Sequence, residues 1–242
     1  MNNVERASVL SEALPYIRAY SKKIVVVKYN SQAMQSKELK KAAISDIVLL
    51  SLVGVRVVVV HDGGTETTGE EIVCMITDEG AKAFSFSGLD ASLFTVEKQG
   101  IDGETVLVNT ELVMVALDNG FIPVISATAR GINKEETCSF SAATAAMELA
   151  VNLDAEKLVL LTDSIGIQNK DGSLMSELQL SKVRLLIKEG IISGEMAHRV
   201  NCCVKAVRKG VPRAHILDGR VQHSILVEML TDSGIGTMII HD

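Results

Sequence analysis

Two short runs of β-branched residues, separated by one helical segment, constrain the fold of this chain more than any other feature. The first run, 24–27, ends in Lys28, and the second, 57–60, ends in a polar His-Asp-Gly-Gly turn at 61–64. Short apolar runs bounded by turn residues are typical of buried parallel strands. Residues 22–64 therefore predict a strand–helix–strand unit, and in open α/β sheets ligands bind at the carboxyl ends of such strands.

Helical and strand-like segments alternate along the rest of the chain. We expect further strands at 81–87, 93–97, 105–108, 121–126, 157–162, 214–217 and 237–240, and helices at 4–20, 71–77, 110–119, 141–152, 181–189, 195–209 and 223–230. The alternation predicts an α/β fold in which a mostly parallel sheet is covered by helices on both faces.

A few residues carry specific local expectations. Pro15 should kink or break the first helix, and Pro123 should place its strand at a sheet edge or at a strand start. Ser141 and Ser181 should cap the helices that follow them. Residues 127–137, between a strand and a helix, are interpreted as a loop.

Composition argues against several classes of protein. The net charge is −6 and the aromatic content is 3%, without any basic run, which argues against a nucleic-acid partner. No apolar run is long enough for a membrane span, and the polar start of the chain lacks a signal-peptide core, so we expect a cytoplasmic protein without a membrane partner. The four cysteines form no Cys-x-x-Cys pair and the five histidines no His-Glu-x-x-His motif. This predicts reduced packing cysteines and no metal site.

Several polar residues follow predicted strands or open predicted helices, where an anion could bind. Lys28 could hold phosphate oxygens, or could be a strand-end lysine that reaches water. Gly63-Gly64 would let backbone amides approach an anion, or would only form a tight turn. Thr162-Asp163 could contact a nucleotide or cap a turn, and Arg199 could add charge at a helix start or lie at the surface. No Walker, Gly-x-Gly-x-x-Gly or nucleophile–base motif is present, so these residues alone predict an α/β protein with an anion site.

Longer segments match one known family, in order, along nearly the whole chain. They are 9–17, Val27-Lys28-Tyr29 with Ala33-Met34, 119–125, 155–163, 170–174, and Asp218-Gly219-Arg220 through 234–239. On these segments the chain resembles the N-acetyl-L-glutamate kinases of the amino acid kinase superfamily. The resemblance implies a three-layer α-β-α sandwich around a mainly parallel sheet of about eight strands. It also implies a single domain over 1–242, with an acyl-amino-acid-binding lobe at 1–150 and a nucleotide-binding lobe at 151–242.

The activity implied by the resemblance is phosphorylation of the γ-carboxylate of N-acetyl-L-glutamate by ATP with Mg²⁺, a step of arginine biosynthesis, with no metal ligand assigned to the protein. Phosphoryl transfer of this kind works by positioning and charge neutralisation. By position, the family's residues correspond to Lys28 and Arg199 as catalytic residues, to Gly63, Gly64, Ser139 and Ser141 as substrate-binding residues, and to Thr162, Asp163 and Gly166 as nucleotide-binding residues. The N-terminal helix resembles one that joins dimers into hexamers, so a homodimer or hexamer is expected.

The chain departs from the family pattern at the phosphate and substrate positions. Asp62 replaces a loop glycine and brings a carboxylate toward negative ligands. Asn30-Ser31-Gln32 replaces Gly-Gly-Asn, so side chains obstruct backbone approach. Ala143 replaces an aspartate that orients both catalytic lysines, and Arg199 replaces the second of those lysines. The family's substrate lid, which would lie between 64 and 71, is missing.

These departures leave two hypotheses. The chain is either an acetylglutamate kinase with impaired turnover or a catalytically inactive homologue that serves as a binding or regulatory subunit. Ser139 and Ser141 also replace asparagines, one of which is a substrate ligand in the family. The differences are concentrated at ligand positions, whereas the strand and turn segments are kept.

Overall fold

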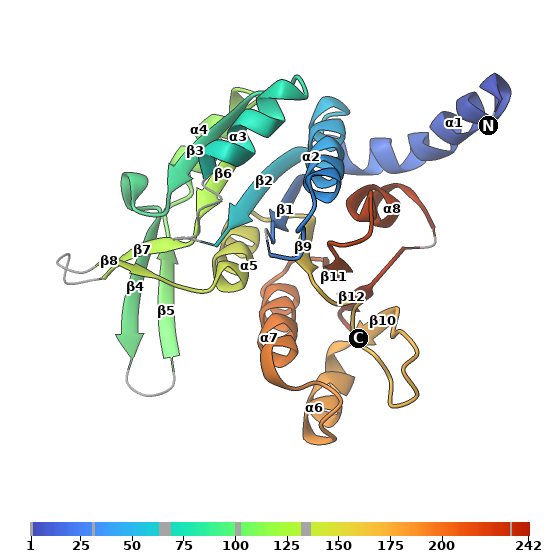
Figure 1. The fold of residues 1–242 in the computed structure, drawn as a ribbon. Coiled ribbons are helices and arrows are strands. Elements are labelled where there is room, and N and C mark those ends of the chain that lie inside the picture. The colour runs from blue at the N-terminus through green and yellow to red at the C-terminus, as the bar shows by residue number, and fades with distance from the viewer. Residues whose placement is uncertain (1, 31, 63–68, 100–102, 132–136, 233) are drawn as a thin grey trace.

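The centre of the molecule is one eight-stranded sheet with helices on both faces (Figure 1). The computed structural model describes residues 2–30, 32–62, 69–99, 103–131, 137–232 and 234–242. The strand order is β10-β12-β11-β9-β1-β2-β6-β3, and only β11 and β12 pair antiparallel. The strands are β1 (Ile24–Lys28), β2 (Arg56–His61), β3 (Ala83–Ser87), β6 (Ile122–Ser126), β9 (Lys157–Thr162), β10 (Glu177–Gln179), β11 (Arg213–Asp218) and β12 (Thr237–Ile240). The predicted three-layer sandwich is confirmed.

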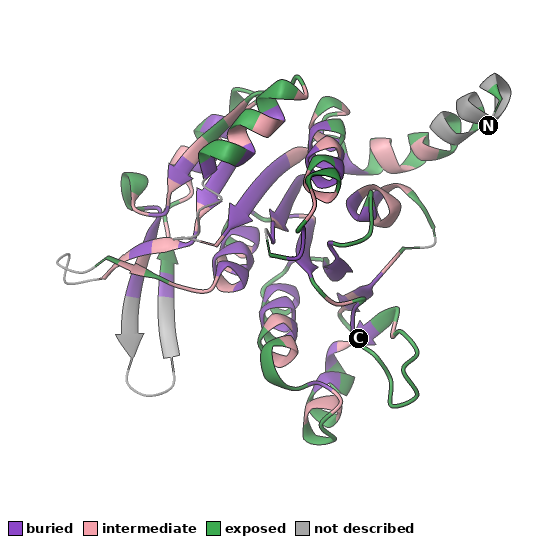
Figure 2. Ribbon diagram, viewed as in Figure 1, coloured by how far each residue is buried: buried purple, intermediate pink, exposed green. Residues whose placement is uncertain are grey.

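The sheet divides the hydrophobic core into two parts, and helices cover each of them. They are α1 (Asn3–Tyr20), α2 (Lys37–Leu52), α3 (Gly69–Asp78), α4 (Glu111–Asp118), α5 (Ala142–Asn152), α6 (Leu180–Lys188), α7 (Gly194–Arg208) and α8 (Ser224–Leu230), with a short 3₁₀ helix η1 (Asp90–Ser92). Val26 packs with α5 and α7, whereas Val25 and Val27 pack with α2 and α8. The apolar run of β1 is therefore buried on both faces (Figure 2). No described helix is long and apolar enough to cross a membrane.

A second, four-stranded sheet lies beside the main one, with the order β5-β4-β7-β8. Its strands are β4 (Phe94–Gln99), β5 (Gly103–Val108), β7 (Thr128–Gly131) and β8 (Thr137–Ser139). The prediction of a loop over 127–137 is wrong, because Thr128–Gly131 and Thr137–Ser139 pair antiparallel. These short, mixed segments become strands through tertiary packing: Ala129 is fully buried, and the Phe140 ring packs edge-on against Phe94.

Four local expectations can be compared with the structure, and those for Ser181 and Cys74 are wrong. The helix α1 continues through Pro15 without a break. Pro123 lies in β6, an interior strand, as its second residue, so the expected position at a strand start is confirmed. Pairing with β2 begins only at Val124, so no hydrogen bond to β2 is lost. Ser181 lies inside α6 and does not cap it; instead its N–H donates to the carboxylate of Asp242. Cys74 is exposed, so it is not a packing residue.

A buried aspartate joins the two halves of the chain. Asp46 on α2 is fully buried and accepts hydrogen bonds from His223 Nδ1 at 2.7 Å and from the Leu226 N–H at 3.4 Å. It therefore supplies an acceptor to the first turn of α8, as a capping side chain would, but from a distant helix. Burial raises the pKa of Asp46, against the lowering effect of the His223 hydrogen bond.

Candidate active site at the carboxyl ends of the central strands

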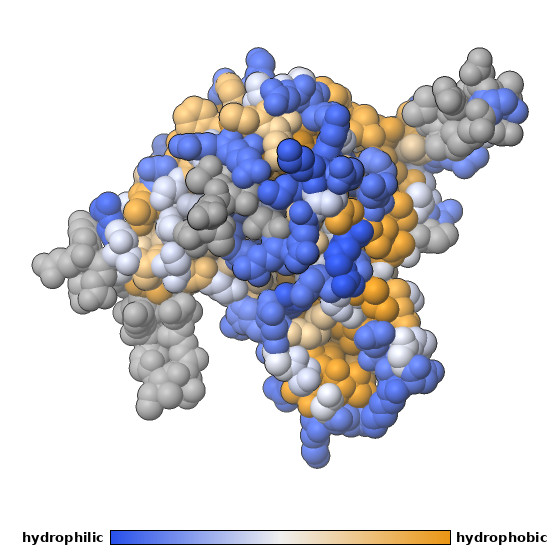
Figure 3. All heavy atoms as spheres, in the orientation of Figure 1, coloured by the Kyte–Doolittle hydropathy of each residue, from blue (hydrophilic) through white to orange (hydrophobic). Residues whose placement is uncertain are grey.

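The ends of adjacent parallel strands meet two helix starts at one small pocket. Lys28 ends β1, and its register partners are Val60 on β2 and Leu160 on β9. The pocket has a volume of about 70 Å³, and its lining includes Lys28, Asp62, Ser141, Thr162, His198 and Arg199. Polar side chains gather across the middle of the face shown in Figure 3. The fold thus brings Lys28 and Arg199, far apart in sequence, to the same site.

Lys28 is held by an acidic neighbour. Its Nζ donates to Asp62 Oδ2 at 3.0 Å, and the lysine side chain is only 13% exposed, against 41% for the aspartate. Lys28 ends β1, and Asp62 directly follows the neighbouring parallel strand β2, which places their side chains at the same sheet edge. An incoming phosphate must therefore either displace Asp62 from Lys28 or bind beside a neutralised pair.

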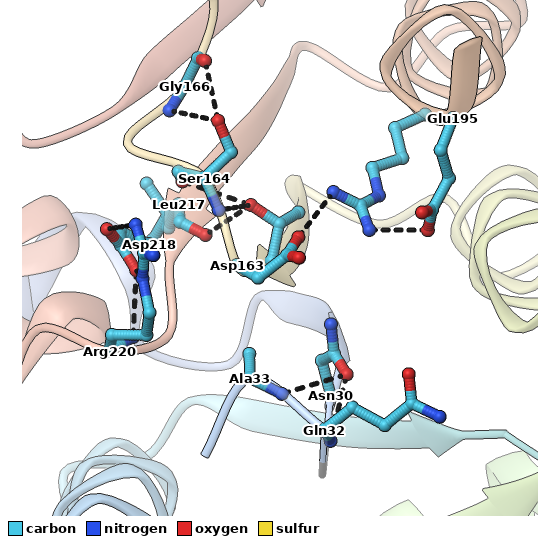
Figure 4. Close-up of polar contacts among 12 residues, drawn as sticks. Asn30, Gln32, Ala33, Asp163, Ser164, Gly166, Glu195, Leu217, Asp218 and Arg220 are labelled. Atoms are coloured by element: carbon cyan, nitrogen blue, oxygen red, sulfur yellow. Dashed lines mark hydrogen bonds and ion pairs between the residues drawn. The ribbon is translucent and has the colours of Figure 1, made fainter. Parts of the chain in front are cut away.

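Arg199 is held in the same way by two carboxylates. It donates to Asp163 Oδ1 at 3.0 Å and to Glu195, one helical turn earlier on α7 (Figure 4). Its side chain is 12% exposed, whereas those of both partners are mostly exposed. The hydrogen bond from Arg199 lowers the pKa of Asp163. Both candidate catalytic cations are therefore paired within the chain.

The loop after β1 satisfies its own backbone donors. The buried Asn30 side chain accepts through Oδ1 from the N–H groups of Gln32 at 3.1 Å and Ala33 at 3.3 Å (Figure 4). This is an Asx turn, in which a side-chain oxygen occupies amides that would otherwise face a ligand or water. Ser31 lies outside the described residues. The loop therefore offers an anion fewer free amides than a glycine loop would.

Two of the predicted nucleotide-binding residues shape their loop. The Thr162 hydroxyl is buried, accepts from the Ser164 N–H, and lies within hydrogen-bonding distance of the carbonyl oxygens of Ser164 and Leu217. Gly166 has φ of +123°, and a Cβ there would lie 2.7 Å from Thr237 Oγ1. Asp163, between them, is 63% exposed. Of the three, Asp163 is the side chain that a nucleotide could reach.

The predicted substrate-binding residues are only partly brought together. Ser141 lies in the pocket, begins α5, and accepts from the Thr144 N–H at 3.4 Å, so its predicted capping role is confirmed. Ser139 is exposed on β8 and does not line the pocket. Gly63 and Gly64 lie outside the described residues.

Two residues at the site, His198 and Arg220, were not predicted from the sequence. His198 lines the pocket and its Nε2 lies 2.8 Å from Ser141 Oγ. Its position beside Arg199 on the predicted helix was the only available signal, because Ser141 is distant in sequence. Arg220 binds Asp218 in a fork, Nε to Oδ1 at 2.9 Å and Nη2 to Oδ2 at 2.8 Å, which lowers the pKa of that carboxyl (Figure 4). Arg220 is half exposed and follows β11, next to β9.

The protein side chains do not form a ready-made cation cage. Across the described ranges, no three His, Cys, Asp or Glu side chains are grouped closely enough to hold a metal ion. Mg²⁺ generally enters phosphoryl-transfer sites with substrate phosphates and one or two carboxylates. The residues present therefore fit a metal only as part of a nucleotide complex, for which Asp62, Asp163 and Glu195 are the exposed carboxylates described above.

Comparison with known proteins identifies the family. Residues 67–218 match the amino acid kinase family. The acetylglutamate kinase of Clostridium kluyveri is 38% identical over 283 residues, covering 99% of this chain and 100% of that protein. The acetylglutamate kinase of Desulforamulus reducens is 38% identical over 285 residues, covering 99% of both chains. The chain belongs to the amino acid kinase family. Within it, the sequence is acetylglutamate kinase-like over nearly its full length, as the sequence segments predicted.

Solved structures agree on the fold. N-acetylglutamate synthase from Neisseria gonorrhoeae superposes with a TM-score of 0.83 at 24% identity, covering 98% of this chain. The present chain spans 63% of that longer protein. Giardia carbamate kinase superposes with a TM-score of 0.68 at 16% identity, covering 91% of this chain and 99% of its own. At these identities the likeness establishes the amino acid kinase fold.

The alignment with the Clostridium kinase also reveals a shortfall. It spans 283 positions, whereas this chain has 242 residues, so at least 41 positions of that relative have no counterpart here. A missing lid between 64 and 71 would contribute to this shortfall, and that location stays a prediction.

Proposed function

We propose that this chain transfers the γ-phosphoryl group of ATP to the γ-carboxylate of N-acetyl-L-glutamate, slowly, as a cytoplasmic enzyme of arginine biosynthesis. The observation that carries the proposal is the convergence of Lys28 and Arg199 on one pocket at the strand ends, in a chain similar to acetylglutamate kinases over nearly its full length. Its relatives are kinases, and kinases of this fold use ATP.

In the proposed reaction the two cations neutralise the transferring group. Lys28 would contact phosphoryl oxygens as a compact charge, and Arg199 would contact them through its planar fork. Mg²⁺, brought by the nucleotide, would supply further charge neutralisation on the phosphates. The protein's own contribution is to hold Lys28 and Arg199 in place before the nucleotide binds.

The binding roles of the two lobes follow from the same arrangement. We assign nucleotide binding to residues 151–242, where Asp163 and the half-exposed Arg220 follow neighbouring strands. The acyl amino acid is assigned to residues 1–150, with Ser141 at the pocket. Gly63, Gly64 and Ser139 are kept as candidate substrate contacts.

Slow turnover is expected from the contacts that these donors already make. Asp62 neutralises Lys28, Asp163 and Glu195 neutralise Arg199, and Asn30 occupies two loop amides. Each contact has to be exchanged for a ligand contact before phosphoryl transfer. The missing lid would also leave the substrate less protected from water.

The test is direct detection of the acyl phosphate. Purified protein is incubated with Mg·ATP and N-acetyl-L-glutamate, and hydroxylamine traps the product as a hydroxamate. We expect hydroxamate above the level given by the Lys28→Ala variant. Equal signals from the two proteins would overturn the proposal.

The second candidate function is a catalytically inactive binding or regulatory subunit. The observation that favours it is the full internal pairing of Lys28 and Arg199. Calorimetry with Mg·ATP and with N-acetyl-L-glutamate, separately, distinguishes the two functions when combined with the hydroxamate assay. Ligand binding without hydroxamate supports this second function, and measurable turnover excludes it.

The oligomer that we propose is a homodimer or a hexamer. The helix α1 extends away from the sheet (Figure 1) and contacts α8, and its Tyr16 hydrogen bonds to Asp232, just after α8. A helix that projects in this way could be covered by another subunit. Light scattering should give two or six times the chain mass of 26.0 kDa; a monomer would contradict this.

A further inference from the structure

We propose that Ser141 is an internal phosphoryl acceptor, which the bound nucleotide phosphorylates with His198 as the base. The inference rests on the proposed function, because it uses the same nucleotide and the same two cations. The pocket would then have two phosphoryl acceptors: the γ-carboxylate of the substrate, and the hydroxyl of Ser141 in the chain itself.

The hydrogen bonds around Ser141 orient its O–H toward His198. Ser141 Oγ accepts from the Thr144 N–H at 3.4 Å, which leaves its O–H free to donate. His198 Nε2 lies 2.8 Å away. The same Nε2 faces the thiol of Cys202 at 3.8 Å, a second possible donor. With two donors facing it, Nε2 is assigned as the unprotonated ring nitrogen, so its lone pair points at the Ser141 proton.

The surroundings of this pair suit phosphoryl transfer. Lys28 and Arg199 line the same pocket of about 70 Å³ as Ser141 and His198. Position 143, in the first turn of α5, is an alanine that lines the pocket without adding a charge beside the serine. A hydroxyl, an imidazole base and two cations therefore share one small volume, which is the set of groups that transfer to an alcohol requires.

The reaction balances without any further reactant. A bond forms between Ser141 Oγ and the γ-phosphorus of ATP, and the bond between that phosphorus and the β,γ-bridging oxygen breaks. Its electron pair leaves with ADP. His198 Nε2 takes the Ser141 proton and later releases it to water.

The pocket would also stabilise phosphorylated Ser141. A phosphoserine brings close to two negative charges, and it is stabilised opposite cationic side chains and at a helix start. Ser141 is the residue that caps α5, and Lys28 and Arg199 line its pocket. The phosphate would compete with Asp62 for Lys28, so modification would change the charge state of the whole site.

The experiment measures phosphate on Ser141 and acyl phosphate in parallel. The full-length protein is incubated with Mg·ATP, and intact mass followed by peptide mapping locates any added phosphoryl group. The Ser141→Ala variant should gain none. The matched control is Ser36→Ala: Ser36 also caps a helix, accepting from the Leu39 N–H at 3.2 Å, but lies on α2 outside the pocket. This control should gain the phosphoryl group as the native chain does.

A third variant tests the base. At saturating Mg·ATP, so that a change in nucleotide affinity does not enter the rate, His198→Gln should lower phosphoserine formation by about 100-fold or more, because general bases contribute roughly 10²–10⁴. Absence of phosphate from Ser141 in the native chain overturns the inference, whether or not hydroxamate forms. Phosphoserine without hydroxamate supports it and overturns only the proposed carboxylate acceptor.

Discussion

The Nζ atom of Lys28 lies 3.0 Å from Oδ2 of Asp62, so the lysine at the end of the central strand already has an anionic partner. The pair forms because β1 and β2 are parallel neighbours whose ends lie side by side. Arg199 repeats this arrangement with Asp163 and Glu195. The candidate kinase site is thus assembled but internally neutralised.

Asp62→Gly should strengthen nucleotide binding. The substitution removes the carboxylate that competes for Lys28, and because a surface ion pair is worth about 0.2–1 kcal/mol, affinity should rise by up to about five-fold. Calorimetry with Mg·ATP measures the change, which should shrink at high salt. Unchanged or weaker binding at low salt would show that Asp62 does not restrain Lys28.

Ala143→Asp alone should not restore efficient turnover. Lys28 and Arg199 already have carboxylate partners, so another carboxylate in the pocket adds repulsion toward phosphates. The double variant Asp62→Gly with Ala143→Asp keeps the charge of the site and moves the carboxylate from the end of β2 to α5. Steady-state rates should therefore rank the double variant above Ala143→Asp. A gain of tenfold or more from Ala143→Asp alone would contradict this reasoning.

Gly166→Ala should destabilise the fold by more than about 1 kcal/mol, because alanine is strained at positive φ and its Cβ would lie 2.7 Å from Thr237 Oγ1 and 2.8 Å from Leu174 Cδ1. Gly172→Ala is the matched control, since Gly172 has φ of +83° with open space around it. Urea denaturation should show a smaller loss for the control. Equal losses would assign the whole effect to backbone strain.

Asp46→Asn should change how stability depends on pH. Burial raises the pKa of Asp46, so the folded protein holds this proton more tightly than the unfolded chain, whose aspartates titrate near pH ~3.9. Stability from this group is therefore present at low pH and is lost as pH rises through the raised, folded-state value. The native chain should lose stability relative to the variant between about pH 4 and neutrality. If urea titrations show the same difference in unfolding free energy between the native chain and the variant at every pH, the raised pKa of Asp46 is refuted.

The parts of the fold that could be predicted are those that local sequence determines. The buried runs of β1, β2 and β9 are β-branched or apolar throughout and bounded by turn residues, so their strands were evident. The strands β7 and β8 were missed, because their polar sequences pair only when Ala129 is buried in the body of the molecule.

For the candidate site, the sequence predicted individual residues but not the contacts between them. Lys28, Thr162 and Arg199 were candidates from their strand-end and helix-start positions, and family resemblance added Ser141. Asp62 was recognised as unfavourable for an anionic ligand. That Asp62 pairs with Lys28 could not be predicted from the sequence, because the contact depends on the β1–β2 register. The Ser141–His198 pair joins α5 to α7, and a contact between residues this far apart leaves no periodic signal in the sequence.

The most direct test of the account is a hydroxamate time course that compares the native chain with its Lys28→Ala and Asp62→Gly variants under identical Mg·ATP and N-acetyl-L-glutamate. The account predicts that Asp62→Gly forms acyl phosphate fastest, the native chain more slowly, and Lys28→Ala slowest. A native rate no different from that of Lys28→Ala would contradict it.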